Sequence, residues 1–141
     1  MTVIRRGTAA EVIDVRHAVL RPGRPRATAV FSGDDAPDTR HWVAEVEGRV
    51  VGVASVMAAP APDGLPASWQ LRGMAVLPEL QGRHVGAELL RAVQADVADP
   101  LWCNARAAVE GFYAGLGWRG VGERFEIEPI GPHRRMWWSR A

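Results

Sequence analysis

The stretch 71–90 constrains the fold of this chain more than any other part of its sequence. An apolar run, WQLRGMAV (69–76), has the length and composition of a buried strand, and Pro78 ends it. Beyond this proline, apolar residues recur every fourth position, at Val85, Leu89, Val93 and Val97. That spacing predicts an amphipathic helix from about Gly82 to Asp96. A strand followed so closely by a helix favours a fold in which helices pack on a sheet.

The start of this predicted helix has the chemistry of a phosphate-binding site. The amides of a first helical turn have no carbonyl partner, and the helix dipole adds partial positive charge there. Gly82 and Gly86 carry no side chain that would keep a pyrophosphate away, and Arg83 can add charge. Many α/β folds need small residues at such a junction, so this pattern alone does not identify a ligand.

The rest of the sequence predicts a mixed sheet with helices packed on it, an α/β (α+β) fold. Thr8 and Glu11 have the spacing of a capping box before a helix that runs to about Leu20, with Glu11, Asp14 and Arg16 expected to face outward. The segment 21–40 has no sustained periodicity and is expected to be irregular. Further strands are expected at 3–6, on both sides of a Glu47–Gly48 turn within 41–57, and at 101–105, 122–128 and 133–139. A further helix is expected from the stripe Ala105, Ala108, Val109, Phe112 and Leu116.

Composition narrows the classes of function. The 141 residues suffice for one compact domain with a buried core and are too few for two. With 48% apolar residues and a net charge of +1, the chain is not expected to be disordered or to coat nucleic acid. The single cysteine cannot form an intrachain disulfide, and the start MTVIRRGTAAEVIDV lacks the apolar run of a signal peptide. We therefore expect a cytoplasmic protein with no membrane or nucleic-acid partner.

Two short motifs resemble those of one enzyme family. Gln81-Gly-Arg-His-Val-Gly-Ala87 is similar to the Gln/Arg-x-x-Gly-x-Gly/Ala signature of the GCN5-related N-acetyltransferases, the GNAT family. The segment GFYAGLGW (111–118) is similar to the second motif of that family, a helix that carries Phe-Tyr and ends in Leu-Gly-aromatic. The motifs occur in the order of the family, and the predicted elements suit its fold. One departure is His84, where the family usually has glycine; a histidine there is strained if the position needs a positive φ.

The resemblance implies a single GNAT domain over 1–141, with a mixed, mostly antiparallel sheet whose splayed central strands are flanked by helices. It implies acetyl-CoA as co-substrate and no metal. The backbone of Met74, Ala75 and Val76 is expected to bind the pantetheine arm. The residues expected to cradle the pyrophosphate are Gln81, Gly82, Arg83, His84, Val85, Gly86 and Ala87. Arg106, where many relatives have an asparagine near the cofactor, and Asn104 are further expected contacts.

Tyr113 is the match to the general acid of the family, and it is the only tyrosine in the chain. A phenol with a pKa of about 10 protonates a thiolate only if the site shifts the balance between them. The alternative for Tyr113 is simple packing beside Phe112. For the base, the candidate is His133, because an unperturbed imidazole suits proton removal at neutral pH and the residue follows a PIGP turn expected near the acceptor, although water can replace any side-chain base.

The expected acceptor contacts are charged residues and one histidine. Glu126, a second candidate catalytic residue, and Glu128 alternate on a predicted strand, so they share one face that either receives an ammonium group or is solvated. Arg72 either forks a substrate carboxylate or faces outward from its strand. His41, beside the irregular segment, is a candidate for the acceptor wall.

These expectations describe an enzyme that moves acetyl from acetyl-CoA to a primary amine of a small molecule or peptide by direct attack in a ternary complex. A protein acceptor, a longer acyl donor and an acyl-CoA-binding regulatory module without turnover are the alternatives. The assembly is left open and includes a homodimer. Trp137 and Trp138 cannot both face one side of a strand, so one of them is a candidate acceptor or subunit contact.

Overall fold

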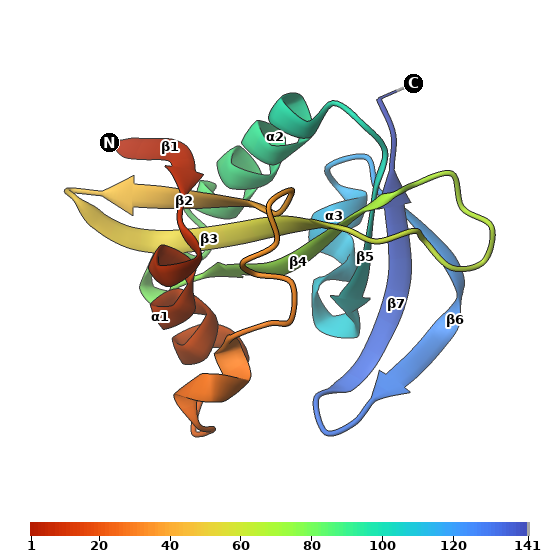
Figure 1. Ribbon diagram of the computed structural model, residues 1–141, viewed down its shortest axis with the longest axis horizontal. Helices are drawn as coiled ribbons and strands as arrows, with labels where there is room; N and C mark the ends of the chain where they lie inside the picture. The colour runs from red at the N-terminus through yellow and green to blue at the C-terminus, as the bar shows by residue number, and fades with distance from the viewer. Residues whose placement is uncertain (141) are drawn as a thin grey trace. The chain divides into compact units, whose positions relative to one another are not determined.

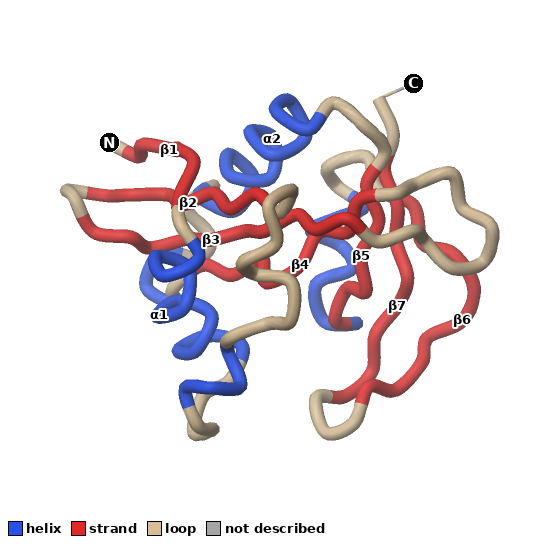
Figure 2. Tube along the Cα trace, viewed as in Figure 1, coloured by secondary structure: helices blue, strands red, loops and turns tan. Residues whose placement is uncertain are grey.

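The computed structural model of the chain describes residues 1–140 and contains seven strands and three α-helices (Figures 1 and 2). The strands are β1 (Thr2–Gly7), β2 (Arg40–Val46), β3 (Arg49–Ala58), β4 (Trp69–Val76), β5 (Leu101–Arg106), β6 (Arg119–Ile127) and β7 (Gly131–Trp138). The helices are α1 (Ala9–Leu20), α2 (Val85–Val97) and α3 (Glu110–Ala114), with short 3-10 turns η1 (Arg26–Ala29), η2 (Pro78–Leu80) and η3 (Ala107–Val109). The strands are hydrogen-bonded in the order β1-β2-β3-β4-β5-β7-β6. This mixed α/β architecture confirms the predicted fold class.

The chain divides into two compact units, one of residues 1–58 with 71–97 and one of 59–70 with the residues from 98 onward. In the first unit β1, β2 and β3 form an antiparallel meander, and Glu47 and Gly48 turn between β2 and β3 with positive φ angles of 52° and 77°. The two helices of this unit pack on opposite faces of its strands (Figure 1). Ser55 of β3 contacts α1, whereas a Cβ built at Gly52 would meet Leu89 of α2 at 3.4 Å.

Helix α1 begins with the predicted capping box. The Thr8 hydroxyl accepts a hydrogen bond from the Glu11 amide, and the Glu11 carboxylate accepts one from the Thr8 amide at 2.9 Å. The buried residues of the helix include Val12, Ile13 and also Arg16, which is completely inaccessible to solvent. The prediction that Arg16 faces outward is therefore wrong. Arg16 lies four residues after Val12 and three after Ile13, which places it in the middle of the buried stripe.

In the second unit β5, β7 and β6 pair antiparallel, and β4 joins β5 in parallel through Trp69 with Leu101 and Gln70 with Trp102. Only the first two of the eight β4 residues, which belong to the second unit, take part in this ladder. The helix predicted within 105–116 is shorter than expected, because β5 runs to Arg106 and the helix proper covers only 110–114.

The apolar stripe predicted for this helix is also wrong in part, since Val109 is 43% exposed while Tyr113 and Trp118 are buried. Gly117 has the predicted left-handed φ of 91°, but it is not the helix cap, because the helix ends at Ala114 and its C-cap is Gly115 with a φ of −64°. None of the helices within residues 1–140 is long and apolar enough to cross a membrane. The expectation of a single domain stays a prediction.

Candidate active site

The loop before α2 has the geometry expected of an anion cradle. Gly82 and His84 both have left-handed backbone angles, φ 78° and 65°, so the strain expected at His84 is present and α2 starts at Val85 rather than Gly82. A Cβ built at Gly82 would meet nothing within 4 Å, so the backbone there is open to a ligand. The first helical hydrogen bond runs from the Glu88 amide to the His84 carbonyl at 3.0 Å. The amides of 85–87 precede it and point out of the helix start.

Strand β4 and this loop are tied together by a side-chain hydrogen bond. The Gln81 amide nitrogen Nε2 donates to the Val76 carbonyl oxygen at 2.9 Å. Gln81 therefore fixes the end of β4, and it occupies one acceptor position of a carbonyl that the sequence assigns to the pantetheine arm. Ala75 is buried, whereas Arg83 and His84 are exposed beside the loop.

Tyr113 is buried on α3 and its ring makes edge contacts with Phe112 and Trp118, at centroid distances of 5.3 and 5.2 Å. Burial, with a smaller contribution from the neighbouring Cys103, raises the pKa of the Tyr113 phenol well above 10.0. The side chain is thus both a packed aromatic and a donor that stays protonated near neutral pH.

Cys103 lies on β5 and is buried. Burial in apolar surroundings raises the pKa of its thiol far above its ordinary value of 9.0. A thiolate is the reactive form of cysteine, so this thiol is inert near neutral pH.

Asn104 and Arg135 face each other in the register of β5 and β7, as do Arg106 and His133. These pairs lie on the opposite face of the strands from Cys103. The Oδ1 atom of Asn104 and the Nε atom of Arg135 are buried, and within the described residues neither has a hydrogen-bond partner. Asn104 therefore offers an unused acceptor, as expected of a cofactor contact.

Arg135 is a polar residue of this face that the sequence analysis missed. Its NH1 atom donates to Asp63 at 2.7 Å, and its guanidinium lies 5.0 Å from the ring centroid of Phe125. The sequence could have indicated Arg135, because it lies two residues after His133 and residues at that spacing share one face of a strand.

His133 is buried, and its Nδ1 atom donates to the Gly131 carbonyl at 2.7 Å. In the neutral ring this assigns the free acceptor position to Nε2, the atom that a base would use. The ring stacks on Phe125 at a centroid distance of 6.2 Å. Helix α3 lies on the other face of β7, since its Glu110 pairs with Arg134 at 3.5 Å. Within the second unit, His133 and Tyr113 therefore lie on opposite faces of the strands.

Glu126 and Glu128 are both exposed. Glu126 pairs with Pro132 and its neighbour Phe125 with His133, so the Glu126 side chain is on the face away from His133. The prediction that the two glutamates share one strand face is wrong, because β6 ends at Ile127 and Glu128 belongs to the following turn.

Arg72 and His41 both differ from the simplest expectation. Arg72 does not point outward into solvent: it is partly buried, with its guanidinium 4.6 Å from the ring centroid of Phe31. His41 is buried, accepting from Ser55 Oγ at Nδ1 (2.6 Å) and donating from Nε2 to the Asp34 carbonyl (3.0 Å). With both nitrogens engaged, His41 braces the interior of the first unit instead of lining an acceptor wall.

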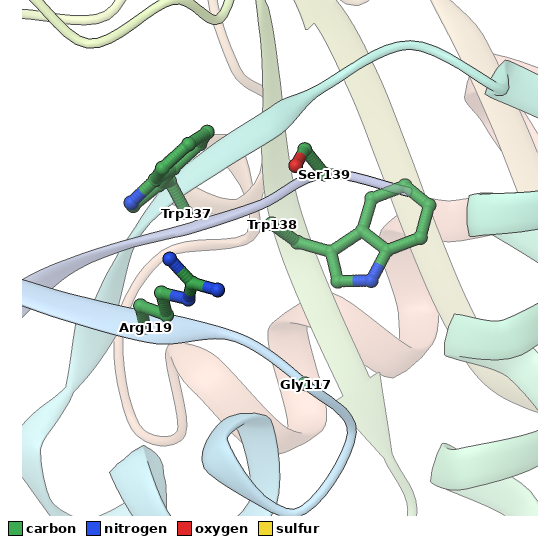
Figure 3. A pocket seen from close by; sticks show the side chains of 5 residues that line it. All are labelled: Gly117, Arg119, Trp137, Trp138 and Ser139. Carbon is green, nitrogen blue, oxygen red and sulfur yellow. The ribbon is translucent and has the colours of Figure 1, made fainter. Parts of the chain in front are cut away.

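A shallow pocket of about 180 Å³ lies in the second unit (Figure 3). Its lining consists of Gly117, Arg119, Trp137, Trp138 and Ser139. Trp137 and Trp138, one of which is a candidate acceptor or subunit contact, both line it, whereas none of the residues predicted to bind the cofactor or to act in catalysis does. Within residues 1–140 no group of three or more His, Cys, Asp or Glu side chains is placed to hold a metal ion.

Comparison with known proteins identifies the class. The acetyltransferase (GNAT) domain family matches residues 37–120. YitI of Bacillus subtilis (strain 168), described as an uncharacterized N-acetyltransferase, is 31% identical over 142 residues that cover 97% of this chain and 95% of YitI. The chain therefore belongs to the GNAT acetyltransferase family, and the family resemblance predicted from its sequence is confirmed.

Solved structures agree in fold. A protein described as histone acetyltransferase HPA2 and related acetyltransferase, from Corynebacterium glutamicum ATCC 13032, superposes with a TM-score of 0.79 at 20% identity, covering 99% of this chain and 97% of its own. An aminoglycoside 6'-N-acetyltransferase complexed with coenzyme A gives 0.76 at 14% identity, covering 96% and 95%. Members of this family transfer an acyl group from an acyl-CoA, which makes the chain an N-acetyltransferase in the broad sense.

Proposed function

We propose that this protein transfers acetyl from acetyl-CoA to a primary amine of a small molecule or peptide, by direct attack of the amine on the thioester in a ternary complex. The observation that carries the proposal is the Tyr113 side chain, which is buried and whose raised pKa keeps its hydroxyl protonated at neutral pH. It occupies the position that the family resemblance assigns to the acid.

The open loop before α2 supports the choice of a CoA thioester as donor. We assign the pyrophosphate to the amides of 85–87 and the backbone of Gly82, with Arg83 and His84 beside them. We assign the pantetheine arm to the backbone of 74–76, and further contacts to Asn104 and Arg106. The orphaned Oδ1 of Asn104 fits this role, because a buried acceptor without a partner costs free energy until a donor reaches it.

The departing thiolate needs a proton or a hydrogen bond, and we assign this to Tyr113. A raised pKa keeps the phenol protonated at neutral pH, so it is always in the donating form. Water is excluded around a buried phenol, which strengthens a hydrogen bond from it to a developing negative charge. For the base we retain two candidates, His133, whose Nε2 is the free acceptor, and Glu126. A water molecule can take the place of either side chain.

Direct attack is favoured over a covalent acyl-cysteine because the only cysteine is a poor nucleophile. Cys103 is buried and its pKa is raised. A thiol that stays protonated does not accept the acetyl group at a useful rate. The amine must therefore meet the thioester itself.

A thioester-cleavage assay that detects free CoA thiol, run with a panel of amines, tests this proposal. We expect acceptor-dependent thiol release, with initial-rate plots that intersect when both substrates are varied. Binding of acetyl-CoA without acceptor-dependent release would instead make the protein an acyl-CoA-binding module. Parallel lines would reject the ternary complex, and release only with protein substrates would move the acceptor to a protein.

A further inference from the structure

Arg16 anchors a buried polar cluster of the first unit. Its NH1 and NH2 atoms form a two-pronged ion pair with Asp34, at 2.8 and 2.9 Å. NH1 also donates to the Ala29 carbonyl at 3.0 Å and NH2 to Ser55 Oγ at 2.9 Å. The Phe31 amide donates to the same carboxylate at 2.8 Å, which fixes the irregular segment against α1. The Asp34 carboxylate is therefore already paired with Arg16 and hydrogen-bonded within its own segment.

Three guanidinium groups surround the ring of Phe31, and the single carboxylate of Asp34 cannot neutralise all of them. The guanidinium carbons of Arg16, Arg72 and Arg21 lie 4.1, 4.6 and 5.5 Å from its centroid. Arg72 forms no ion pair within the part of the chain that the structure describes, and its one polar contact is Met57 Sδ, 4.0 Å from NH1. Arg72 is thus a partly buried cation without an anion.

Gly73 keeps this arrangement in place. Its φ of 64° interrupts the regular strand geometry directly after Arg72. A Cβ built there would lie 2.6 Å from Arg16 Nε and 3.2 Å from Phe31. Only glycine allows β4 to approach the buried cluster this closely. With β4 this close, the Arg72 guanidinium lies against the ring of Phe31.

An unpaired, partly desolvated guanidinium is costly, and an anion that binds it removes the cost. Burial and the charge of Arg16 lower the pKa of Arg72, and Asp34 opposes this only in part. A guanidinium also matches the planar two-oxygen geometry of a carboxylate.

We propose that Arg72, held against Phe31, binds a carboxylate of the acceptor, so that the substrates of this enzyme are amines that carry a carboxylate close to the amino group. This inference rests on the proposed function. Arg72 lies two residues before the 74–76 stretch, which we assign to the pantetheine arm, so a carboxylate held by Arg72 would lie close to the segment that holds the donor. That proximity suits an α- or β-amino acid, in which the carboxylate and the amine are a few ångströms apart.

The test compares each carboxylated amine with its own carboxamide. Acetyl transfer is measured with L-amino acids and β-alanine and with the amide of each, for wild-type protein and for Arg72→Gln. We expect wild type to prefer the carboxylates and Arg72→Gln to lower kcat/KM for them by about 10- to 100-fold, chiefly through KM. The amides should change less than about twofold, and Arg72→Lys should retain part of the preference.

Two controls keep the outcome specific. Arg91→Gln removes an exposed arginine of α2 and should leave both substrate sets unchanged. The KM for acetyl-CoA, measured in parallel, should stay constant in Arg72→Gln. A rise in that KM with every acceptor would show that the cation serves a phosphate of the donor, which overturns the proposal.

An equal loss with acids and amides would also overturn it, because Arg72 would then act only on structure. Should no amine be acetylated, the proposed function fails, and the carboxylate site is tested by binding alone. Thermal unfolding with L-amino acids or their amides then decides: stabilisation by the acids that is lost in Arg72→Gln supports the site, and equal effects of acids and amides reject it.

Discussion

Two regions of the molecule bury ionisable side chains in opposite ways. In the first unit Arg16 and Asp34 are charged and are held by hydrogen bonds from three chain segments. In the second unit Tyr113 and Cys103 are protonated, and burial raises both of their pKa values. Burying a charge requires a partner, whereas a neutral phenol or thiol is buried at a much smaller cost in free energy. The first arrangement supports structure, and the second keeps a protonated donor for chemistry.

The largest effect is expected from removing one partner of the ion pair. Asp34→Ala leaves Arg16 charged and buried, and we expect it to lower the free energy of unfolding by about 3–5 kcal/mol. Urea titration followed by tryptophan fluorescence measures this. Asp38→Ala, an exposed aspartate of the same segment, is the matched control and should change stability by less than about 0.5 kcal/mol.

The double variant Arg16→Met with Asp34→Leu sharpens the same point. Removing both charges leaves no unpaired ion, so the double variant should be more stable than Asp34→Ala. If the double variant is the less stable of the two, the pair contributes more than charge compensation and the contrast between the regions weakens.

The second effect is on catalysis. Tyr113→Phe removes only the hydroxyl and keeps the ring contacts with Phe112 and Trp118, so stability should change by less than about 1 kcal/mol. Loss of the proton donor should lower kcat by about 100-fold. Steady-state kinetics and urea unfolding of one preparation give both values. Unchanged turnover across pH would leave Tyr113 as a packing residue only.

Sequence alone predicts the fold well where a local pattern fixes the structure. The β4 strand, the capping box of α1 and the Glu47–Gly48 turn depend on neighbouring residues, and all three are confirmed. For His84 the sequence analysis states only a condition, strain if the position needs a positive φ, and the structure has that φ.

The cluster around Arg16 could not be predicted in the same way. A charged residue in an apolar stripe is normally solvent-exposed, and its burial here depends on Asp34, 18 residues away, and on Ser55, 39 residues away. The assignment of Arg72 to solvent or to a buried ring likewise depends on Phe31 from another segment. Pairings between distant residues leave no local periodicity to detect.

The two regions should also differ in how the free energy of unfolding depends on pH. Burial raises the pKa of Asp34, but hydrogen bonds from Arg16 and the Phe31 amide and the charge of Arg16 outweigh it, so the pKa in the fold lies below 3.8. Because the unfolded state binds the proton more readily, the contribution of this pair is complete above the unfolded pKa and is lost as pH falls through the folded pKa. Asp34→Asn should therefore flatten the acid limb.

The second unit should respond at the opposite end of the pH scale. The pKa values of Cys103 and Tyr113 are raised in the fold, so their contribution is complete below the unfolded values and is lost as pH rises above about 8.5 for the thiol and about 10 for the phenol. The chain has no lysine to mask this limb. Urea unfolding at pH 7 to 11 should show a loss of up to about 1.4 kcal/mol per pH unit per group, smaller in Tyr113→Phe. An identical alkaline limb in wild type and Tyr113→Phe would contradict a buried phenol.

The smallest effect is expected in the loop before α2, in the first unit. There backbone strain at His84, and not a buried charge, lowers the free energy of unfolding. A left-handed conformation costs a non-glycine residue about 1–2 kcal/mol, and a glycine at that position removes this cost. Glycine also raises the conformational entropy of the unfolded chain, which offsets part of the stabilisation. His84→Gly should therefore stabilise the fold by about 0.5 kcal/mol. Arg83→Gly is the control: its φ is not positive, so the same substitution one residue earlier should destabilise. If backbone alone holds the phosphates, the KM for acetyl-CoA stays unchanged in His84→Gly. A raised KM would show that the imidazole contacts the donor and would explain why this chain retains a strained histidine.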